Sequence, residues 1–273
     1  MASYLKLIRF PNLLLLVLAQ AMLCGGLYVP PQEWSWSVYA LFLGTACVAG
    51  RGYMLNDWFD VPTDRLNRPE RPLVRGVISS MAFWILHITL GVLAVGAALK
   101  VPAPVWQSWI IADILLVFYA RYSKQMSIGA NLMVAGLSGW SLMLVGALTG
   151  TFQVALYLVA GTATLLHLVR ELVKDLEDME GDRFINAVTL PLQWGVARTV
   201  GLVQGLMLVL LAVIGGLSIV FDSLPARSLL LLMGIQVLGL CYYLWKNRQQ
   251  AHFSRLSAWL KALMFEGLFL ALL

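Results

Sequence analysis

Two short stretches hold most of the acidic residues of this 273-residue chain. Ten of the 14 acidic residues lie in residues 56–70 and 171–183. Each stretch repeats one pattern of two aspartates and an arginine: Asp60, Asp64 and Arg65 in the first, and Asp178, Asp182 and Arg183 in the second. Clustered carboxylates suit Mg²⁺, a hard cation that takes oxygen ligands and keeps phosphate and water among them. Two such sets around one cavity can hold Mg²⁺ on a diphosphate, with Arg and Lys taking the other phosphate oxygens.

The rest of the chain indicates which solvent surrounds these residues. The sequence is 60% hydrophobic and 12% charged, with a mean hydropathy of +0.80, whereas soluble domains average about 45–50% apolar and about 25% charged residues. Runs long enough to cross a bilayer as helices recur along it, and the short alternating strands of a membrane barrel are absent from the sequence. We expect an all-α, polytopic membrane protein in one domain, residues 1–273, with pseudo-repeat halves of roughly 1–125 and 126–273. Nine helices are expected around a central cavity, at residues 12–28, 37–55, 77–99, 104–120, 128–148, 152–172, 197–220, 226–245 and 256–273.

The basic residues predict the orientation. With the N-terminus in the cytoplasm, 17 of the 19 basic residues fall on the cytoplasmic side, Arg51, Arg248 and Lys261 among them, and only Lys100 and Arg227 on the other. Both acidic stretches then face the cytoplasm, from the inner membrane if the cell is prokaryotic. The net charge of +5 indicates this orientation and contact with anionic lipid rather than a nucleic-acid surface. The three cysteines are singly spaced and predict neither a disulfide nor a zinc site.

A proline interrupts the first acidic stretch. Asn56, Asp60 and Asp64 are four residues apart, a spacing that puts all three on one face of a continuous helix. Pro62 cannot donate a backbone hydrogen bond to Trp58, so the helix should kink or end there. We therefore expect Asp64 on a separate short segment that returns toward Asn56 and Asp60.

The sixth expected span has a polar stripe, which is expensive in lipid unless it lines a wet cavity. The stripe comprises Thr164, His167, Glu171, Asp175, Asp178 and Asp182, flanked by Arg170 and Lys174. Asp113, in the middle of the fourth span, is either a cavity residue or a carboxyl that is protonated or bonded to a neighbouring helix. Arg9 either reaches to lipid headgroups or contacts a ligand. His87 is expected to be an ordinary core histidine, and the last three spans, Glu266 excepted, are expected to be wall.

The motif Asn56-Asp57-x-x-Asp60-x-x-x-Asp64-Arg65, with Asp178-x-x-x-Asp182 and nine helices, resembles the UbiA-type superfamily of intramembrane prenyltransferases over essentially the whole chain. The resemblance implies catalytic roles for Asp60, Asp64, Asp178 and Asp182. It implies Mg²⁺ as cofactor, held by Asn56, Asp60, Asp64, Asp178 and Asp182, with Asp57 and Asp175 as additional motif acids. The residues expected to bind substrate are Arg9, Asn56, Arg65, Arg68, Arg71, Lys124, Asn131, His167, Arg170 and Lys174.

Within the superfamily, Asn67-Arg68-Pro69-x-Arg71-Pro72-Leu73 and residues 170–182 look most like geranylgeranylglyceryl phosphate geranylgeranyltransferases. The implied reaction is Mg²⁺-dependent transfer of a polyprenyl group from its diphosphate to a lipid acceptor. Aromatic-acceptor prenyltransferases of the hydroxybenzoate or homogentisate type share much of this frame and stay open as an alternative. So do a terpene cyclase of the same fold and a transporter, whose ionisable residues would lie near the midplane on broken helices.

One departure from the family pattern concerns the base that meets the diphosphate. The family's Tyr-x-x-x-Lys/Arg element after the fourth helix is not present as such, because Tyr119 is followed by Arg121 two residues on and by Lys124 five residues on. Either basic residue is therefore a candidate.

Overall fold

The computed structural model describes residues 2–247 and 250–272. Arg248, counted above among the basic residues, and residue 273, the end of the ninth expected span, lie outside the described residues. Every regular element in the described part is helical, which confirms the all-α prediction.

Nine long helices coincide with the nine expected spans. They are α2 (Phe10–Leu27), α3 (Trp36–Phe59), α5 (Ser80–Ala98), α6 (Ala103–Tyr122), α7 (Ile128–Thr149), α8 (Val154–Glu177), α11 (Val196–Val220), α12 (Leu224–Lys246) and α13 (Gln250–Leu268). Eight are long and apolar enough to cross a membrane, among the residues described. The exception is α13, which includes Arg255, Lys261 and Glu266. The chain is thus an integral membrane protein, and a ninth span remains a prediction.

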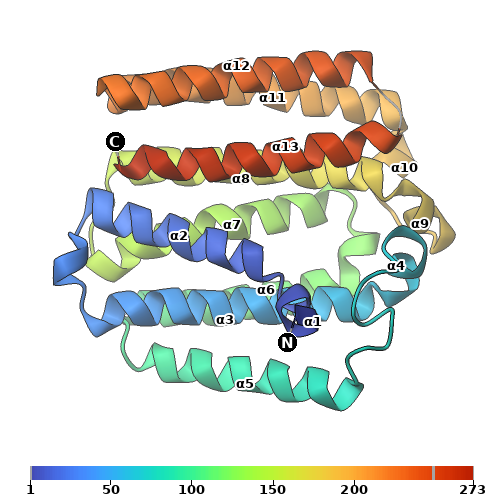
Figure 1. Ribbon diagram of the computed structural model, residues 1–273, viewed down its shortest axis with the longest axis horizontal. Helices are drawn as coiled ribbons and strands as arrows, with labels where there is room; N and C mark the ends of the chain where they lie inside the picture. Colours follow the sequence, from blue (N-terminus) through green and yellow to red (C-terminus); the bar gives the residue numbers. More distant parts are fainter. Residues whose placement is uncertain (1, 248–249, 273) are drawn as a thin grey trace.

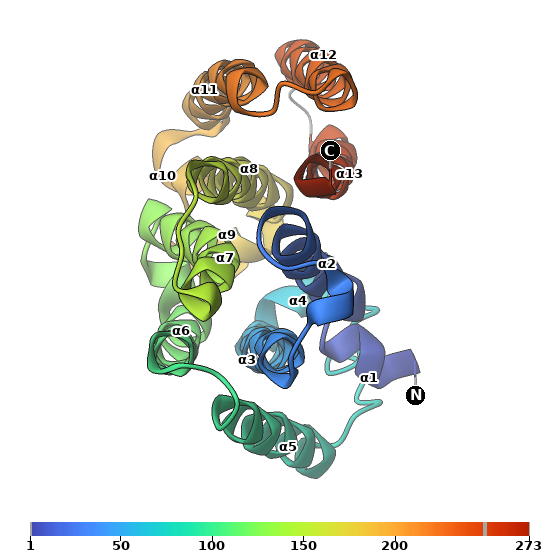
Figure 2. The ribbon, with the colours of Figure 1, turned by 90° about the vertical axis from the view of Figure 1, so that its left-hand side faces the viewer.

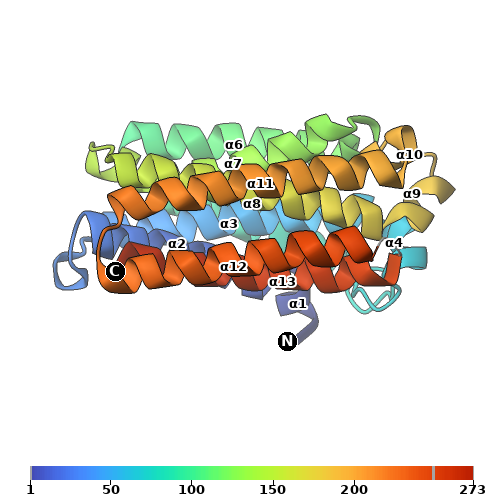
Figure 3. The same ribbon diagram turned by 90° about the horizontal axis from the view of Figure 1, so that it is seen from above.

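The long helices lie side by side along one direction, and four shorter ones connect or precede them (Figures 1 and 3). The short helices are α1 (Ala2–Leu7), α4 (Val61–Asn67), α9 (Met179–Phe184) and α10 (Leu190–Trp194). Seen end-on, α2, α3, α6, α7, α8 and α13 surround the centre, while α5, α11 and α12 lie outside them (Figure 2). Helices α4 and α9 contact each other at one end of the bundle.

Small residues bring neighbouring helices close together, as in other membrane bundles. A Cβ atom on Gly139 of α7 would lie 2.7 Å from the carbonyl oxygen of Ala160 and 1.9 Å from the hydroxyl of Thr164, both on α8. Thr164 therefore faces α7 and does not line the central cavity. The predicted polar stripe is wrong at this position, because a hydroxyl can bond its own helix, here the Ala160 carbonyl at 2.9 Å.

A charged pair lies inside the bundle, away from the acidic motifs. Arg51 lies within α3, and its guanidinium contacts the carboxylate of Asp113 on α6 at 3.3 Å and the ring of His87 on α5 at 3.3 Å. Arg51 is therefore not a loop residue. Asp113 is bonded to a neighbouring helix and does not line the cavity, so the second of the two readings of Asp113 holds.

Candidate functional site

Both acidic motifs occupy the same kind of junction. Helix α3 has 24 residues and ends at Phe59, directly before Asp60, and α8 has 24 residues and ends at Glu177, directly before Asp178. A short helix follows each junction: α4 begins at Val61 with Pro62 in its first turn, and α9 begins at Met179 after a bend at Asp178. The backbone N–H of Asp64 donates to Asp60 at 2.8 Å, and that of Asp182 donates to Asp178 at 3.1 Å. The helix break predicted at Pro62 is confirmed.

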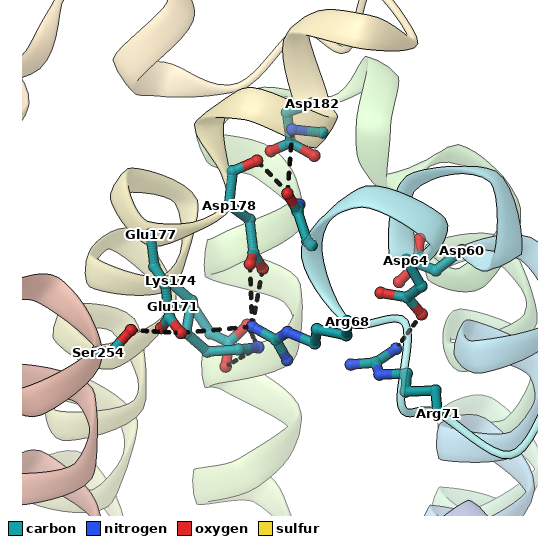
Figure 4. A network of polar contacts seen from close by, with 12 residues as sticks. Asp60, Asp64, Arg68, Arg71, Glu171, Lys174, Glu177, Asp178, Asp182 and Ser254 are labelled. Carbon is teal, nitrogen blue, oxygen red and sulfur yellow. Dashed lines mark hydrogen bonds and ion pairs between the residues drawn. The ribbon is translucent and has the colours of Figure 1, made fainter. Parts of the chain in front are cut away.

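The two junctions are held against each other by the end of α4 (Figure 4). The Arg68 guanidinium donates to both carboxylate oxygens of Asp178, at 3.0 Å each. The amide of Asn67 donates to the Asp178 backbone carbonyl at 3.0 Å and accepts from the Gly181 N–H at 3.1 Å. A Cβ at 181 would lie 2.5 Å from the Asn67 amide nitrogen, so the Asn67 side chain would have to move away from its present contacts. The motifs, 118 residues apart, thus form one site.

Every motif carboxylate has a polar partner in this structure. Asp64 accepts from Arg71, Asp57 from Arg9 (2.6 Å) and Arg71 (3.0 Å), Asp60 from Asn56 (2.6 Å), Asp182 from Lys124 (2.6 Å), and Asp175 from Asn131 (2.9 Å). Two of these acids, Asp60 and Asp175, accept their hydrogen bonds from neutral amides. The acids of the site therefore outnumber the bases paired with them, which favours added cations.

Burial sets the electrostatics of the two second aspartates. It raises the pKa of Asp64 to about 6, partly opposed by the charge of Arg71. Burial likewise raises the pKa of Asp182, opposed by Lys124 and reinforced by the negative charges of Asp178 and Asp60. Asp60 and Asp182 come from different motifs, so the effect of the Asp60 charge on the pKa of Asp182 shows that the two motifs interact electrostatically.

The donor set fits a hard cation after a rearrangement of side chains. The second oxygen of the Asp182 carboxylate is buried and accepts no hydrogen bond from the described residues. Within the described chain no three acidic, histidine or cysteine side chains converge closely enough to share a metal ion, because Arg68 and Lys124 occupy the space between carboxylates. If these two bases withdraw, oxygen ligands of the type that Mg²⁺ prefers remain.

A cavity of about 270 Å³ begins beside these junctions and runs into the bundle. Most of its wall comes from α2, α3, α6, α7, α8 and α13, which confirms the predicted central cavity. The wall is polar near the motifs and mostly apolar beyond, as far as Leu23, Trp109 and Leu144. Besides hydroxyl groups of Ser and Thr, its polar lining includes Arg9, Asn12, Tyr53, Asn56, Tyr119, His167, Arg170, Glu171, Lys174 and Lys261.

Most predicted substrate-binding residues lie in this region. Five line the cavity: Arg9, Asn56, His167, Arg170 and Lys174. Four pair with motif acids: Arg68, Arg71, Lys124 and Asn131. Arg65 is exposed on α4 and makes none of the ion pairs seen among the described residues, so the structure does not bring it into the site.

The structure answers two questions that the sequence left open and locates Asp57. Arg9 contacts Asp57 and lines the cavity instead of reaching out to lipid headgroups. Asp57 is buried beneath Arg9 and Arg71 and positions these two arginines. Of the two candidate bases after α6, Lys124 contacts Asp182, while Arg121 is exposed over the rings of Phe59 and Tyr122.

Sequence patterns missed one basic residue of the cavity. Lys261 on α13 lines it and donates to the side-chain oxygen of Asn12 on α2 at 2.6 Å. The last helices were expected to be wall, yet a lysine within an apolar span is a functional candidate by default. The position of Lys261 within an expected span could therefore have identified it from the sequence.

The fold and site can now be compared with known proteins. The chain is 35% identical over 169 residues, 62% of this chain and 59% of the relative, to a digeranylgeranylglyceryl phosphate synthase of Thermococcus sibiricus. It is 32% identical over 248 residues, 90% of this chain and 85% of the relative, to the enzyme of that name of Natronomonas pharaonis.

Solved structures of similar fold include one from work on digeranylgeranylglyceryl phosphate synthase in membranes, with a TM-score of 0.75 and 23% identity, covering 99% of this chain and 96% of that one. Another is a UbiA homologue from Archaeoglobus fulgidus bound to GPP and Mg²⁺, with a TM-score of 0.69 and 17% identity, covering 99% of both chains. The UbiA prenyltransferase family matches residues 13–271. The chain belongs to the UbiA prenyltransferase family.

Proposed function

We propose that this protein transfers a geranylgeranyl group from its diphosphate to the free hydroxyl of geranylgeranylglyceryl phosphate, with Mg²⁺ as cofactor. The observation that carries the proposal is the pair of aspartate junctions, held face to face by Arg68 and Asn67 at the polar end of an apolar cavity. The names of relatives 32–35% identical support the glyceryl phosphate acceptor.

The metal ligands would be Asn56, Asp60, Asp64, Asp178 and Asp182. The Archaeoglobus fulgidus homologue of the same fold is bound to Mg²⁺ together with GPP, and the partnerless oxygen of Asp182 suits a cation here. Bound Mg²⁺ neutralises the charge that develops on a departing diphosphate, which is where electrostatic catalysis contributes most.

The bases of the site exchange partners during binding. Arg68, Arg71 and Lys124 now donate to Asp178, Asp64 and Asp182. Once those carboxylates have other ligands, the three bases are free to donate charge-assisted hydrogen bonds to diphosphate oxygens, to which they are complementary. The apo ion pairs therefore keep the cations within reach of the leaving group.

The cavity holds the rest of the donor. Departure of diphosphate breaks the C1–O bond and leaves a positive allylic carbon, which the rings of Tyr53 and Tyr119 in the lining can stabilise. The acceptor hydroxyl oxygen attacks C1, the new C–O bond forms and the hydroxyl proton passes to the released diphosphate. Apolar walls exclude water, which would otherwise compete with the acceptor.

The site faces the cytoplasm in this proposal. Although Arg51, Arg170, Lys174 and Lys261 lie within helices, the basic residues of the short connections still gather at the end that holds α4 and α9. Lys100 and Arg227 lie at the opposite end. This distribution matches the preference of Lys and Arg for cytoplasmic loops.

The test uses purified protein, labelled geranylgeranyl diphosphate and Mg²⁺, with geranylgeranylglyceryl phosphate, an aromatic acid or no acceptor. We expect product only with the glyceryl phosphate. Asp60→Ala and Asp178→Ala should each abolish turnover while the protein stays folded in detergent. The matched control is Glu180→Ala, which removes an exposed acid from α9. Wild-type turnover in either aspartate variant, or product with the aromatic acid alone, contradicts the proposal.

A further inference from the structure

A second group of charged residues lines the cavity, deeper in the bundle than the aspartate junctions. Arg170 and Lys174 of α8 line the wall with Lys261 of α13, and we call these three residues the basic pocket. Lys174 precedes Asp178 by four residues and Arg170 precedes it by eight, which places them about 6 Å and about 12 Å along the helix axis. The basic pocket therefore begins one helical turn inside the junction.

The basic pocket has more positive charge than its neighbours neutralise. Lys174 donates to both oxygens of Glu171, at 3.0 and 3.1 Å, and Arg170 donates to the same carboxylate at 3.3 Å. Lys261 donates to a neutral amide, Asn12, at 2.6 Å. Three cations thus share one carboxylate. In addition, the Nε of Arg170 is buried and has no acceptor among the described residues.

Uncompensated charge is costly at this depth of a membrane protein, so a charge excess of this kind indicates an anionic ligand. The nearby Arg9 does not change the balance, since it is bonded to Asp57. At the aspartate junctions the carboxylates are in excess, and Asp60 and Asp175 accept their hydrogen bonds from amides. An acidic site suited to cations therefore adjoins a basic pocket suited to an anion.

We propose that the basic pocket binds the phosphate group of the lipid acceptor, separately from the donor diphosphate, which is bound at the aspartate junctions. This inference rests on the proposed function. A phosphate monoester has a charge of about −1.5 to −2 at pH 7, which matches an excess of two positive charges, whereas an aromatic acid supplies one negative charge. The acceptor hydroxyl is a few bonds from its phosphate, so binding next to Lys174 brings it to the donor's reacting carbon.

The test compares Lys261→Gln with wild type on two acceptors, geranylgeranylglyceryl phosphate and the phosphate-free geranylgeranylglycerol. Loss of one hydrogen bond between charged groups should raise KM for the phosphate acceptor about 10- to 100-fold. KM for the donor and KM for the phosphate-free acceptor should not change. Removing the lysine from the protein and the phosphate from the acceptor, separately and together, isolates the contact between them in the same way as a double-mutant cycle.

Two further variants distinguish loss of the positive charge at residue 261 from a general effect of replacing a lysine. Lys261→Arg retains the charge and should restore most of the affinity for the phosphate acceptor, and Lys246→Gln, at the end of α12 over the ring of Tyr242, is the matched control. Acceptor binding without turnover is measured as the rise in Tm that the phosphate acceptor causes in the absence of donor and Mg²⁺, which Lys261→Gln should reduce.

The two proposals fail in different ways. Equal KM changes for both acceptors, or a raised donor KM, would overturn the assignment of the basic pocket while leaving transfer to glyceryl phosphate intact. A wild-type protein that prenylates only the aromatic acid would overturn the proposed function and this inference together.

Discussion

Replacing Gly181 by alanine tests whether the contact between α4 and α9 positions the two acidic motifs. Gly181 is buried, and its added methyl group would lie 2.5 Å from the amide nitrogen of Asn67 and 2.7 Å from its carbonyl oxygen. Neither aspartate junction would lose a ligand atom. The variant therefore separates the positions of the carboxylates from their identity.

The magnitude follows from the two hydrogen bonds that Asn67 makes across the junction, at 3.0 and 3.1 Å. Each contributes about 0.5–1.5 kcal/mol, so their loss weakens the α4–α9 contact by about 1–3 kcal/mol. Relief of the clash displaces α9, and misplacing catalytic groups by about 1 Å can lower rates about 100-fold. We expect Gly181→Ala to lower kcat/KM about 10- to 100-fold and to raise the Mg²⁺ concentration needed for half-maximal rate.

The assay is prenyl transfer in detergent at increasing Mg²⁺, with Tm measured in parallel. Gly161→Ala is the matched control, because a Cβ on Gly161 of α8 meets no atom within 4 Å. In an Asn67→Ala background the Gly181→Ala change should cost little more, since the clashing side chain is gone. Full activity in Gly181→Ala, or an equal loss with and without Asn67, refutes the reasoning.

Three other outcomes are expected. Burial raises the pKa of Asp64 to about 6, so the apparent Mg²⁺ affinity should fall about tenfold per pH unit below pH 6. An Asp64→Asn variant should lack that dependence. In metal-free protein, the same raised pKa means that Asp64 stabilises the folded state increasingly as the pH falls from about 6 to below the ordinary pKa of an aspartate. Asp113→Asn leaves Arg51 without its acidic partner and should lower the free energy of unfolding by about 1–3 kcal/mol with little change in KM, measured by denaturation in detergent; an unchanged stability contradicts a structural role for this pair. Chelation of Mg²⁺ should stop turnover without unfolding the protein, since each motif carboxylate already has a partner, and donor plus Mg²⁺ should raise Tm; unfolding on chelation contradicts this.

The helices and the location of the site were predictable from local signals. Apolar runs of membrane length located eight of the long helices to within a few residues, because the hydrocarbon core requires about 20 residues per span. Pro62 predicted the break before α4 for a steric reason that depends on no distant contact. The second motif's break at Asp178 has no proline and was not predicted.

Partners were not predictable, because they depend on how the helices pack. The motif acids could be singled out from their spacing, but that Arg68 reaches across 110 residues to Asp178 follows only from the α4–α9 contact. Arg51 was counted among the basic residues on the cytoplasmic side, whereas in the structure it lies within α3 and pairs with Asp113 of α6. Lys261 was not predicted as a site residue because the last three helices were expected to form only the wall of the bundle. In the structure, Lys261 is one of the charged residues of α13, and it lines the cavity.

The matching junctions also bear on the origin of the site. Helices α3 and α8 have equal lengths, each ends one residue before an aspartate, Asp60 or Asp178, and each is followed by a short helix with a buried second aspartate. We propose that the two halves of the chain, roughly residues 1–125 and 126–273, are repeats of one unit, each of which contributes one set of the proposed metal ligands. In a secondary transporter, discontinuous helices break near the midplane. Here both breaks lie at one end of the bundle, and α3 and α8 are continuous along the cavity. The arrangement therefore suits a substrate whose charged group stays at the membrane surface while its apolar chain enters the cavity.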